Sequence, residues 1–529
     1  MVTVHQANFI SPQLGRALAR VLSVVGNPPL YLAGGALRAW LSGLPVKDLD
    51  FTLPAGAVDF ARRLAEELSG ELVGDPAAGL ADDSRGVMVP LDREHDVARV
   101  VWQRRELDFS SFREGAETIE EDLSLRDFTI NAMAVLLNPL ELTQGGGAAG
   151  RGVGWEAEPP EGLAEKLLDP TGGYADLRGR VIRVTSQLSF QADPLRLLRA
   201  HRFQATLGFS LSRESAELIK REHRAVGGVA AERIRAELDL IIAASGAASA
   251  LSAMADNGLL FEVLPEFAAG VGMAQPDSHH LDVASHGLET LACMERILLD
   301  PSPLFPDSYR SLNDYLADPL HPRRTVTLRW AALLHDLGKP AAAARQGGRI
   351  TFHNHDRAGA EMVSALGRRL RFSRERLGLL WKLVANHMWP FHLLNARRGG
   401  KLSLRARLRL LRAMGDDLSP LFLLAMADTL AGRGPGKPPG LEEELAEFHR
   451  ELIAVERERI APLRRLPPLL TGHDLQGECG LSPGPLFKKI LSGLEEARME
   501  GEVNTREQAL DWVKHFVTIQ QHPILRRSG

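Results

Sequence analysis

The chain has 529 residues, of which 44% are hydrophobic and 25% are charged, and its formal net charge is −4. This length exceeds what one hydrophobic core supports, and the balance of apolar and charged residues is that of globular proteins, so a single compact domain and wholesale disorder are both excluded. The small negative charge also excludes a polycation that binds nucleic acid indiscriminately.

Two features bear on the compartment in which the protein works. The two cysteines, Cys293 and Cys479, are far apart and lack metal-ligand spacing, as expected in a reducing environment. No run of about 18 apolar residues could form a membrane span, and the first residues, MVTVHQANFI, lack the pattern of a signal peptide. We therefore expect a cytoplasmic protein without a membrane partner.

The first third of the chain alternates short apolar runs with helical patterns. Residues 57–69 have helical apolar spacing, and the runs that indicate strands are 30–33, 49–53, 87–91, 97–102 and 106–112. From about residue 190 the apolar spacing changes to three and four residues, and strand patterns almost vanish. We predict an α+β fold, with a mixed β-sheet and helices followed by an all-α remainder.

Glycine and proline mark the breaks between these regions. Residues 143–162 are Gly-rich and then Pro-rich, which predicts a flexible loop near the end of the first domain. Similar breaks at 432–440 and 461–468 separate a C-terminal helical segment.

Two glycines follow the first predicted strand directly and begin a helix. Gly34 and Gly35 allow the backbone to approach a ligand closely, and the start of a helix turns free N–H groups towards an anion. A triphosphate would fit there. A tight structural turn is the alternative explanation of the same pair.

Carboxylates follow on the next predicted strands. Asp48 and Asp50 are two residues apart, so on a strand they point to the same face, and like charges placed together favour Mg²⁺ between them. A polar loop before a strand is the alternative. A third carboxylate on a neighbouring strand would complete a two-metal site for nucleotidyl transfer. We choose Asp108 for this role, and Glu106, which has the same parity on its strand, is the competitor.

Five ordered motifs lie between residues 28 and 270: GGALR, KDLDF, EEDLSLRDFTINAMAV, LLDPTGGYADLRGRVIRV and ADPLRLLRAHRFQATLGF. Together they closely resemble the motifs of the class II tRNA nucleotidyltransferases and their bacterial poly(A) polymerase relatives. The resemblance implies a nucleotidyltransferase head that uses Mg²⁺ at Asp48 and Asp50, followed by an all-α neck. It also implies that nucleotide binding involves Gly34, Gly35, Arg38, Arg126, Asp127 and Asn131. For Arg126 and Asp127 the alternative is a salt bridge that fixes a helix burying Ile130 and Met133.

The family selects the incoming base with protein side chains from a Glu-Asp-x-x-Arg motif. The matching residues here are Asp193 and Arg196, which on a helix would share one face, and Arg199 and Arg202 continue in register. Such a pair favours cytosine or adenine, because a carboxylate accepts from the exocyclic amine and a guanidinium donates to ring acceptors. Ala192 replaces the usual Glu and Pro194 follows the Asp, so a helix N-cap at Asp193 is the alternative.

The stretch between the third carboxylate and the Glu-Glu-Asp-Leu motif is short. After Arg113 only EGAETI precedes Glu120, whereas complete CCA-adding members of the family have a long flexible loop here. This similarity to members that add only two cytidines favours CC addition from CTP, with a separate partner enzyme adding A. Complete CCA addition, A addition with ATP and poly(A) synthesis remain the alternatives.

Downstream, three apolar helical segments carry histidine and aspartate. His286, the pair His335-Asp336 and Asp428 form the pattern of a divalent transition-metal site, and the order resembles the HD phosphohydrolase superfamily. This resemblance implies Mn²⁺, Ni²⁺ or a similar ion and the removal of phosphate from 2′,3′-cyclic or 2′-phosphorylated ends. Additional candidate ligands are His353, His355 and His387.

Two stretches are rich in basic residues and could follow a phosphate backbone. Residues 178–235 contain twelve Lys/Arg against five Asp/Glu, and residues 376–415 contain nine against none. A solvated helix surface is the alternative for either stretch. The C-terminal segment resembles the family's tail, which grips tRNA. We place the domains at 1–185 (head), 186–272 (neck), 273–440 (HD domain) and 441–529 (tail).

Overall fold

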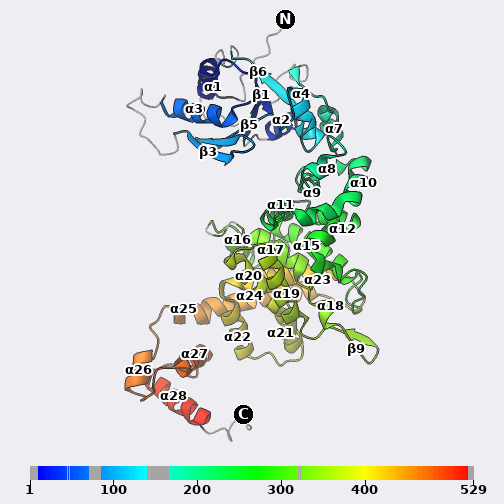
Figure 1. Ribbon diagram of the computed structural model, residues 1–529. Coiled ribbons are helices and arrows are strands. Elements are labelled where there is room, and N and C mark those ends of the chain that lie inside the picture. Colours follow the sequence, from blue (N-terminus) through cyan, green and yellow to red (C-terminus); the bar gives the residue numbers. More distant parts are fainter. Residues whose placement is uncertain are drawn as a thin grey trace. The chain divides into compact units, whose positions relative to one another are not determined.

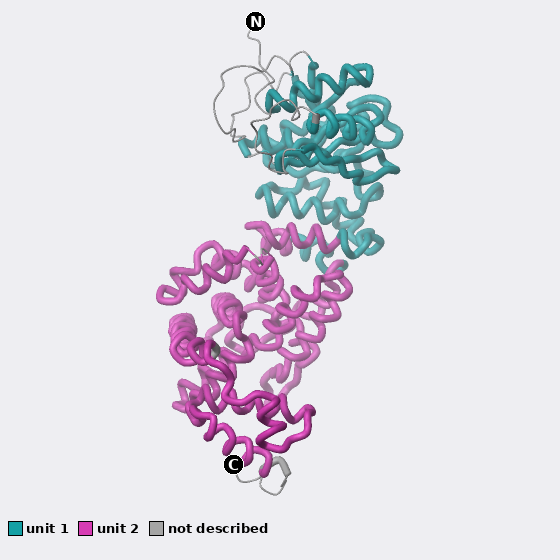
Figure 2. Tube along the Cα trace, turned by 90° about the vertical axis from the view of Figure 1, so that its left-hand side faces the viewer, with its two compact units in different colours: residues 1–233, 253–262 teal, residues 234–252, 263–529 magenta. Residues whose placement is uncertain are grey.

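The structure is a computed structural model, which describes residues 10–44, 46, 48–70, 85–139, 142, 166–319, 321 and 323–521 (Figure 1). The contacts divide the chain into two compact units (Figure 2). Unit 1 comprises residues 1–233 and 253–262, and unit 2 comprises residues 234–252 and 263–529. The whole of the loop predicted at 143–162 lies outside the described residues. The four domain boundaries stay predictions.

Unit 1 is built around a six-stranded mixed sheet. Its strands, in spatial order, are β3 (Val87–Asp92), β4 (Val97–Trp102), β5 (Arg105–Ser111), β2 (Leu49–Leu53), β1 (Leu30–Ala33) and β6 (Ala134–Leu137). Strands β2 and β5 are parallel, and the other neighbours are antiparallel. The predicted mixed sheet and its five predicted strands are confirmed, and β6 is an additional strand.

Helices cover one face of this sheet. Helix α3 (Ala57–Gly70) packs on β3, β4 and β5, and α1 (Pro12–Val24) packs on α3. The side chains that face α3 are apolar and buried; Phe60 of α3, for example, lies 5.4 Å from the ring of Phe109 in β5. Because side chains alternate along a strand, Asp108 and its register partners project from the opposite face. That second face carries the polar residues of the first site.

The segment after β5 does not contain the salt-bridged helix that was the alternative explanation of Arg126 and Asp127. The stretch containing Ile130 and Met133 is not a helix: a 3₁₀ turn, η4 (Thr129–Asn131), leads into β6, which pairs with β1. Arg126 and Asp127 do not pair with each other, because Arg126 donates to Asp122 and Asp127 accepts from Arg199. Ile130 and Met133, which a helix face was expected to bury, are nevertheless fully buried.

Short helices complete unit 1. They are α2 (Gly35–Leu41), α4 (Ile119–Ser124), α7 (Gly173–Gly179), α8 (Ser189–Ala192), α9 (Arg196–Leu207), α10 (Arg213–Glu222) and the 3₁₀ helix η5 (His223–Gly228). Strands β7 (Val181–Ile182) and β8 (Ser210–Leu211) form a small parallel pair. The division between the units falls within the segment of α11 (Ala231–Ala243), α12 (Ala247–Asp256) and α13 (Leu259–Val263).

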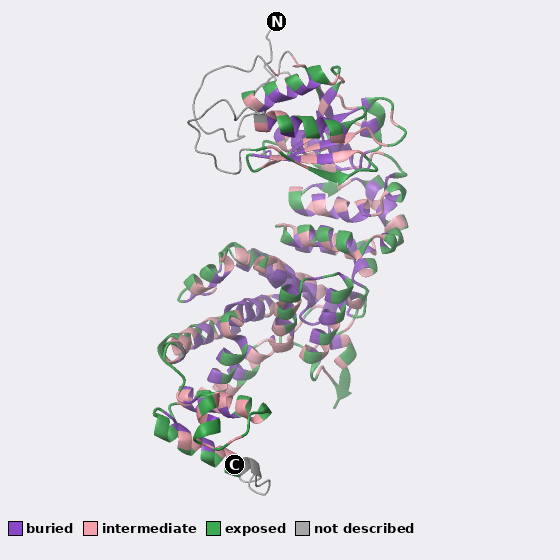
Figure 3. Cartoon of the chain, turned by 60° about the vertical axis from the view of Figure 1, so that its left-hand side comes forward, coloured by how far each residue is buried: buried purple, intermediate pink, exposed green. Residues whose placement is uncertain are grey.

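Unit 2 is helical, as predicted, apart from a hairpin of β9 (Ala344–Gln346) and β10 (Arg349–Thr351). Its central helix is α23 (Leu418–Ala431), which is buried on nearly all sides and contacts α15 (Val283–Leu299), α17 (Arg324–Leu334), α20 (Arg374–Asn386) and α24 (Leu441–Val455). The outer helices bury one side and expose the other (Figure 3). They include α14 (Pro265–Ala268), α16 (Tyr309–Leu316), α18 (Lys339–Ala342), α19 (His355–Arg369), α21 (Trp389–Arg398) and α22 (Leu404–Met414).

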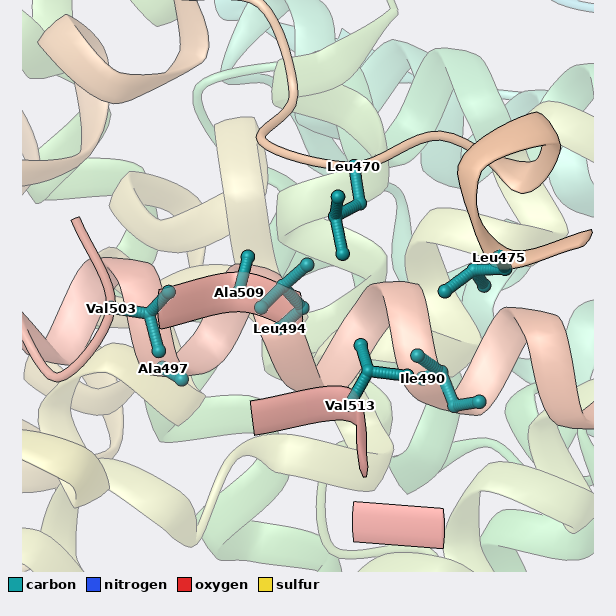
Figure 4. Packing of buried hydrophobic residues seen from close by; sticks show 8 residues of the cluster. All are labelled: Leu470, Leu475, Ile490, Leu494, Ala497, Val503, Ala509 and Val513. Carbon is teal, nitrogen blue, oxygen red and sulfur yellow. The ribbon is translucent and has the colours of Figure 1, made fainter. Parts of the chain in front are cut away.

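The C-terminal part of unit 2 has a small core of its own. After the π-helical turn η7 (Glu456–Ile460) and α25 (Ala461–Arg464), this core is formed by α26 (Gly472–Gly477), α27 (Pro485–Glu500) and α28 (Arg506–Gln521). Its buried residues are Leu470, Leu475, Ile490, Leu494, Ala497, Val503, Ala509 and Val513 (Figure 4). In the described part of the chain, no helix combines the length and the apolar character that a membrane span needs.

Candidate active sites

A cavity of about 590 Å³ in unit 1 gathers the residues predicted to bind a nucleotide. We call it the unit 1 cavity. All ten predicted residues line it: Gly34, Gly35, Arg38, Arg126, Asp127, Asn131, Asp193, Arg196, Arg199 and Arg202. Asp50 and Asp108 also line it, whereas the exposed Asp48, at the bend before β2, is not part of the lining.

The sheet register brings two of the predicted carboxylates together. Asp50 in β2 is the parallel register partner of Asp108 in β5, so the two side chains are neighbours on one face. Burial and the nearby Asp108 carboxylate raise the pKa of Asp50. Carboxylate oxygens in this arrangement fit a hard divalent cation such as Mg²⁺, because its charge would relieve the repulsion between them.

The glycine turn positions a carboxylate rather than leaving free donors for a phosphate. Gly34 has a φ of 72°, and a Cβ there would lie 3.2 Å from Asp50 Oδ2 and from an Arg126 nitrogen, so only glycine fits without displacing them. The Gly35 N–H donates to Asp50 Oδ2 at 3.0 Å. This N–H therefore already orients Asp50, and binding of a triphosphate by Gly34 and Gly35 stays a prediction.

Arginines form another part of the cavity wall. The guanidinium groups of Arg38 and Arg202 lie 4.8 and 4.6 Å from the centre of the Phe203 ring, and burial lowers the pKa of Arg38 to about 10. Asp127 is buried, yet the charge of Arg199 and a hydrogen bond from Asn131 keep its pKa well below the usual range. This wall presents fixed positive charge, which suits a polyphosphate.

The predicted base-selecting pair is placed differently from the expectation. Asp193 does not share a helix with Arg196: it has extended backbone between α8 and α9, and α9 begins at Arg196. Asp193 Oδ1 accepts from the Leu195 N–H at 3.1 Å, as in the capping alternative, and Oδ2 pairs with Arg233 at 3.0 Å. Proline after Asp193 favours this extended conformation. Both predicted side chains still line the cavity.

The connection between β5 and α4 is held tightly. The Arg113 guanidinium and N–H both donate to Asp122 Oδ1, at 2.7 and 3.0 Å, and Arg126 donates to the other oxygen of the same fully buried carboxylate. Thr118 and Glu121 form a capping box at the start of α4. The short stretch after Arg113 is thus anchored at both ends, and Arg113 itself lines the cavity.

In unit 2 the predicted histidines and aspartates converge in two groups of three, here called the histidine cluster. The first group is His286, His335 and Asp428, and the second is Asp336, His355 and His387; within each group the ligand atoms lie within 4.8 Å of one another. Asp336 Oδ2 is 3.1 Å from His335 Nε2, so the two groups are adjacent. The structure thus brings together six of the seven predicted residues.

Hydrogen bonds on the far side of the rings fix which nitrogens face the cluster. In His335, His355 and His387 the Nδ1 atom lies 2.7 to 3.0 Å from the backbone carbonyl three residues earlier, so Nδ1 carries the proton. Their Nε2 atoms then face the cluster, and the Nε2 atoms of His355 and His387 are only 3.1 Å apart. Ring nitrogens that meet in this way fit metal ions, with the carbonyls as outer partners.

The electrostatics of the buried aspartates agree with this. Burial opposes the charged form of His335, but Asp336 and Asp428 raise its pKa to about 10. Positive charge is therefore strongly favoured beside these carboxylates, and a transition-metal ion supplies it as well as a proton does.

A close backbone contact supports the second group: a Cβ at Gly338 would lie 2.1 Å from the His355 carbonyl oxygen, so glycine lets α19 approach the Asp336 turn.

Three residues around the cluster differ from the sequence reasoning. His353 is exposed and belongs to neither group, although it lines a cavity of about 780 Å³ at the cluster. His279, which the sequence reasoning missed, stacks edge-on against His286 with ring centres 4.5 Å apart. Lys339, also missed, contacts Asp336 at 2.6 Å. The neighbouring letters HDLGK signal the lysine, whereas nothing local distinguishes His279.

The second basic stretch, 376–415, is largely neutralised inside unit 2. Its residues pair with acids from other helices: Arg376 with Asp239, Lys382 with Asp417, Arg397 with Glu447 and Glu451, Arg398 with Glu444, Arg405 with Glu500, and Arg412 with Glu496. Most of the charge predicted to follow a phosphate backbone therefore joins helices of this unit to one another.

Family models match three parts of the chain. Residues 30–149 match the poly A polymerase head domain, residues 208–270 match a probable RNA and SrmB-binding site of polymerase A, and residues 283–417 match the HD domain. The first match contains Asp50 and Asp108 of the unit 1 cavity, and the third contains all of the histidine cluster except Asp428.

Similar proteins span nearly the full length. The chain is 32% identical to an A-adding tRNA nucleotidyltransferase of Deinococcus radiodurans, with 92% of this chain and 96% of the relative covered. It is 31% identical to a CC-adding tRNA nucleotidyltransferase of Thermus thermophilus, covering 90% and 92%.

Solved structures share the fold. A Thermotoga maritima CCA-adding enzyme complexed with tRNA matches with a TM-score of 0.55 at 20% identity, covering 95% of both chains. An apo CCA-adding enzyme matches with a TM-score of 0.58 at 19% identity, covering 96% of this chain and 95% of the other.

Proposed function

Because this chain belongs to the tRNA nucleotidyltransferase family, we propose that it adds two CMP residues from CTP to the 3′ end of tRNA, without a nucleic-acid template, and then stops. The observation that carries the proposal is the short connection after Arg113. Accepting cytosine and then the larger adenine requires the base pocket to change shape. A connection pinned by Arg113 and Thr118 has little freedom to drive that change.

In this proposal Asp48, Asp50 and Asp108 hold Mg²⁺. The bound metal supplies the activation of the terminal ribose hydroxyl and the charge that steadies the departing pyrophosphate. Asp50 and Asp108 are already neighbours, and Asp48 lies at the bend two residues before Asp50. The residues that bind the triphosphate are Arg38, Arg199 and Arg202, which line the same cavity.

In this proposal the base is selected by Asp193, just before α9, and by Arg196, the first residue of α9. Arg196 is held by the carbonyl oxygens of Leu125 and Arg126 and by the Ser189 hydroxyl, which fixes its position but uses part of its donor set. Asp193 keeps acceptor capacity beyond its bonds to Leu195 and Arg233. The exocyclic amine of cytosine suits that acceptor.

The test is addition of single labelled nucleotides to defined tRNA ends. A tRNA that ends at the discriminator base should be extended by CTP to CC and no further when ATP is also present. AMP addition to a CC-ended tRNA should be slower by about a hundredfold, which corresponds to about 2.7 kcal/mol of barrier. Efficient formation of CCA would instead assign the complete activity.

A addition is the second candidate, because a relative at 32% identity over 92% of this chain is an A-adding enzyme. In that case the same rigid pocket would be shaped for adenine, and a partner enzyme would add the two cytidines. Efficient AMP addition to CC-ended tRNA together with no CMP addition would select this candidate over the first.

We also propose a second activity at the histidine cluster, the metal-dependent hydrolysis of phosphate esters at RNA ends. Two adjacent groups of ligands and the cavity of about 780 Å³ beside them support it. A metal ion such as Mn²⁺ or Ni²⁺ would supply activated water there. The test is release of phosphate, or opening of a 2′,3′-cyclic phosphate, that depends on the added metal.

A further inference from the structure

An arginine next to the proposed metal ligands has no role in the function described so far. Arg99 in β4 is the register partner of Asp108 in β5, and Asp108 is the register partner of Asp50 in β2. Residues paired in this way share one face of a sheet, with neighbouring strands about 4.8 Å apart. Arg99, Asp108 and Asp50 therefore form a row across three adjacent strands.

The Arg99 guanidinium binds both oxygens of the third carboxylate, Asp108. Its Nε donates to Asp108 Oδ1 at 2.7 Å and its Nη2 donates to Asp108 Oδ2 at 2.8 Å. The remaining nitrogen, Nη1, pairs with a carboxylate oxygen of Glu106, two residues earlier in the same strand. Arg99 thus uses its whole donor fork on the two acids considered for the third metal ligand.

A guanidinium and a metal ion compete for the same carboxylate charge. An arginine side chain stays protonated in proteins, so it can release Asp108 only by moving, and a second anion must then receive it. Glu106 is already bound to Nη1 and can serve as that anion. The side chains of Arg99 and Glu106 are 30% and 41% exposed, which leaves room for such a movement.

We propose that Arg99 is a resident counter-ion of the catalytic carboxylates. It binds Asp108 in the free enzyme, and it releases Asp108 to the metal by rotating away while it stays paired with Glu106. The inference rests on the proposed function, since it takes the metal site of the unit 1 cavity as given. Arg99 is a positioning residue in this scheme, and Glu106 is the anchor of Arg99 rather than a ligand. The pairing of Arg99 with Asp108 thereby lowers the affinity of the site for metal ions.

Iron-directed cleavage of the intact chain tests the proposal at the level of the single site. Fe²⁺ replaces Mg²⁺, and with ascorbate and peroxide it cuts the backbone near the bound ion, so fragment masses separate cuts at β2 and β5 from cuts at the histidine cluster. For Arg99→Gln, the Fe²⁺ concentration giving half-maximal cutting at β2 and β5 should fall by about tenfold, the order expected for one lost charge-assisted pair. Cutting at the histidine cluster should keep its wild-type midpoint.

Control variants separate charge from folding. Arg62→Gln breaks a surface ion pair with Asp59 on α3, which covers the other face of the same sheet, and should leave the midpoint unchanged. Arg99→Lys keeps one charge without the fork and should give an intermediate midpoint. An unchanged or raised midpoint in Arg99→Gln would overturn the proposal.

Glu106→Gln distinguishes an anchor from a ligand. In the wild-type background it should raise the midpoint, because Arg99 then stays on Asp108, and in the Arg99→Gln background it should have no effect. An equal rise in both backgrounds would make Glu106 a metal ligand and overturn its assigned role. A complete lack of cuts at β2 and β5 in every variant, with CTP bound, would instead refute the proposed function.

Discussion

In the unit 1 cavity the acids Asp50 and Asp108 lie side by side on neighbouring strands, whereas the histidine cluster of unit 2 collects side chains from five helices and their ends, spread from His286 to Asp428. The first site is lined by acids and arginines, and the second combines aspartates with buried imidazoles. The first suits a large anionic substrate whose metal arrives with it, and the second suits a metal that stays bound.

The two sites also differ in what fixes their geometry. Register alone makes Asp50 and Asp108 neighbours, so the acids of unit 1 need only the sheet. The cluster of unit 2 needs the rings of His335, His355 and His387 to be oriented by backbone carbonyls, and it needs several helices to pack together. If the two sites work independently, variants in one site should leave the activity of the other unchanged. The following predictions test that independence.

The largest effect is expected at Asp50. We expect Asp50→Asn to reduce nucleotide addition by about a thousandfold or more, because a metal ligand that stabilises the transition state is worth several kcal/mol. The variant keeps the shape of the side chain and its bond to Gly35, so tRNA affinity should change less than about twofold. Single-turnover addition and filter binding measure the two quantities. Retention of a tenth of the wild-type rate would remove Asp50 from its role.

The reciprocal variant is His335→Ala combined with Asp336→Ala. We expect any metal-stimulated hydrolysis of 2′,3′-cyclic phosphate to fall by at least about a hundredfold, since both groups of the cluster lose a ligand. Nucleotide addition should be unchanged. Hydrolysis assays with added Mn²⁺ or Ni²⁺ and addition assays on the same preparation decide it. Collapse of addition in a folded double variant would show that the sites are not independent.

The positions of Asp50 and Asp108 on strands could be predicted from the sequence because their determinants are local. The pattern of apolar runs gave β1 to β5, and parity along β5 left only Asp108 and Glu106 as candidates. Parity cannot say which of the two reaches the site. The row across β4, β5 and β2, and the grip of Arg99, arise from strand order, which no single strand encodes.

Other features escaped because they depend on contacts between distant residues. Strand β6 was missed, since its apolar residues look alike in a helix or a strand until β1 is available as a partner. His279 reaches His286 only because the loop before α15 folds over that helix. The paired charges of residues 376–415 were also hidden, because their acidic partners lie in other segments.

One buried histidine in α9, the helix that carries Arg199 and Arg202, should make unit 1 sensitive to acid. His201 in α9 is buried and neutral, accepts from Asn257 and bonds Gln204, and burial lowers its pKa to about 4. The unfolded chain takes up this proton near pH 6.5, so stability is lost as pH falls from 6.5 towards 4. At about 1.4 kcal/mol per pH unit, the loss reaches about 3 kcal/mol.

Hydrogen exchange of α9 peptides measures this loss locally. We expect protection of α9, corrected for intrinsic rates, to fall between pH 6.5 and 4 in the wild type and to fall less in His201→Gln. The exposed His473 supplies a matched control, and His473→Gln should behave as the wild type does. Equal pH dependence in all three proteins would refute the assignment.

A tenfold effect is expected from the connection after β5. Arg113→Ala removes the pair with Asp122 and should let the pocket change shape, so AMP addition to CC-ended tRNA should rise about tenfold relative to CMP addition, close to the worth of one charged hydrogen bond. Glu114→Ala, at the exposed neighbouring position, is the control and should keep the wild-type ratio. An unchanged ratio in Arg113→Ala would mean that rigidity of this connection does not set specificity.

The smallest effect is expected in the basic stretch 376–415, which was predicted to follow a phosphate backbone. Arg405 and Arg412 pair with Glu500 and Glu496 of α27, so replacing both by Gln should change tRNA affinity less than about twofold and stability by less than about 1 kcal/mol. The contrast is Arg178 with Arg224 in unit 1, which are exposed and form no ion pair with another described residue. Removing those two charges should lower the salt dependence of tRNA binding by about two counterions. Equal effects of the two double variants, measured by binding at several salt concentrations, would mean that ion pairing within the protein does not decide which basic residues meet RNA.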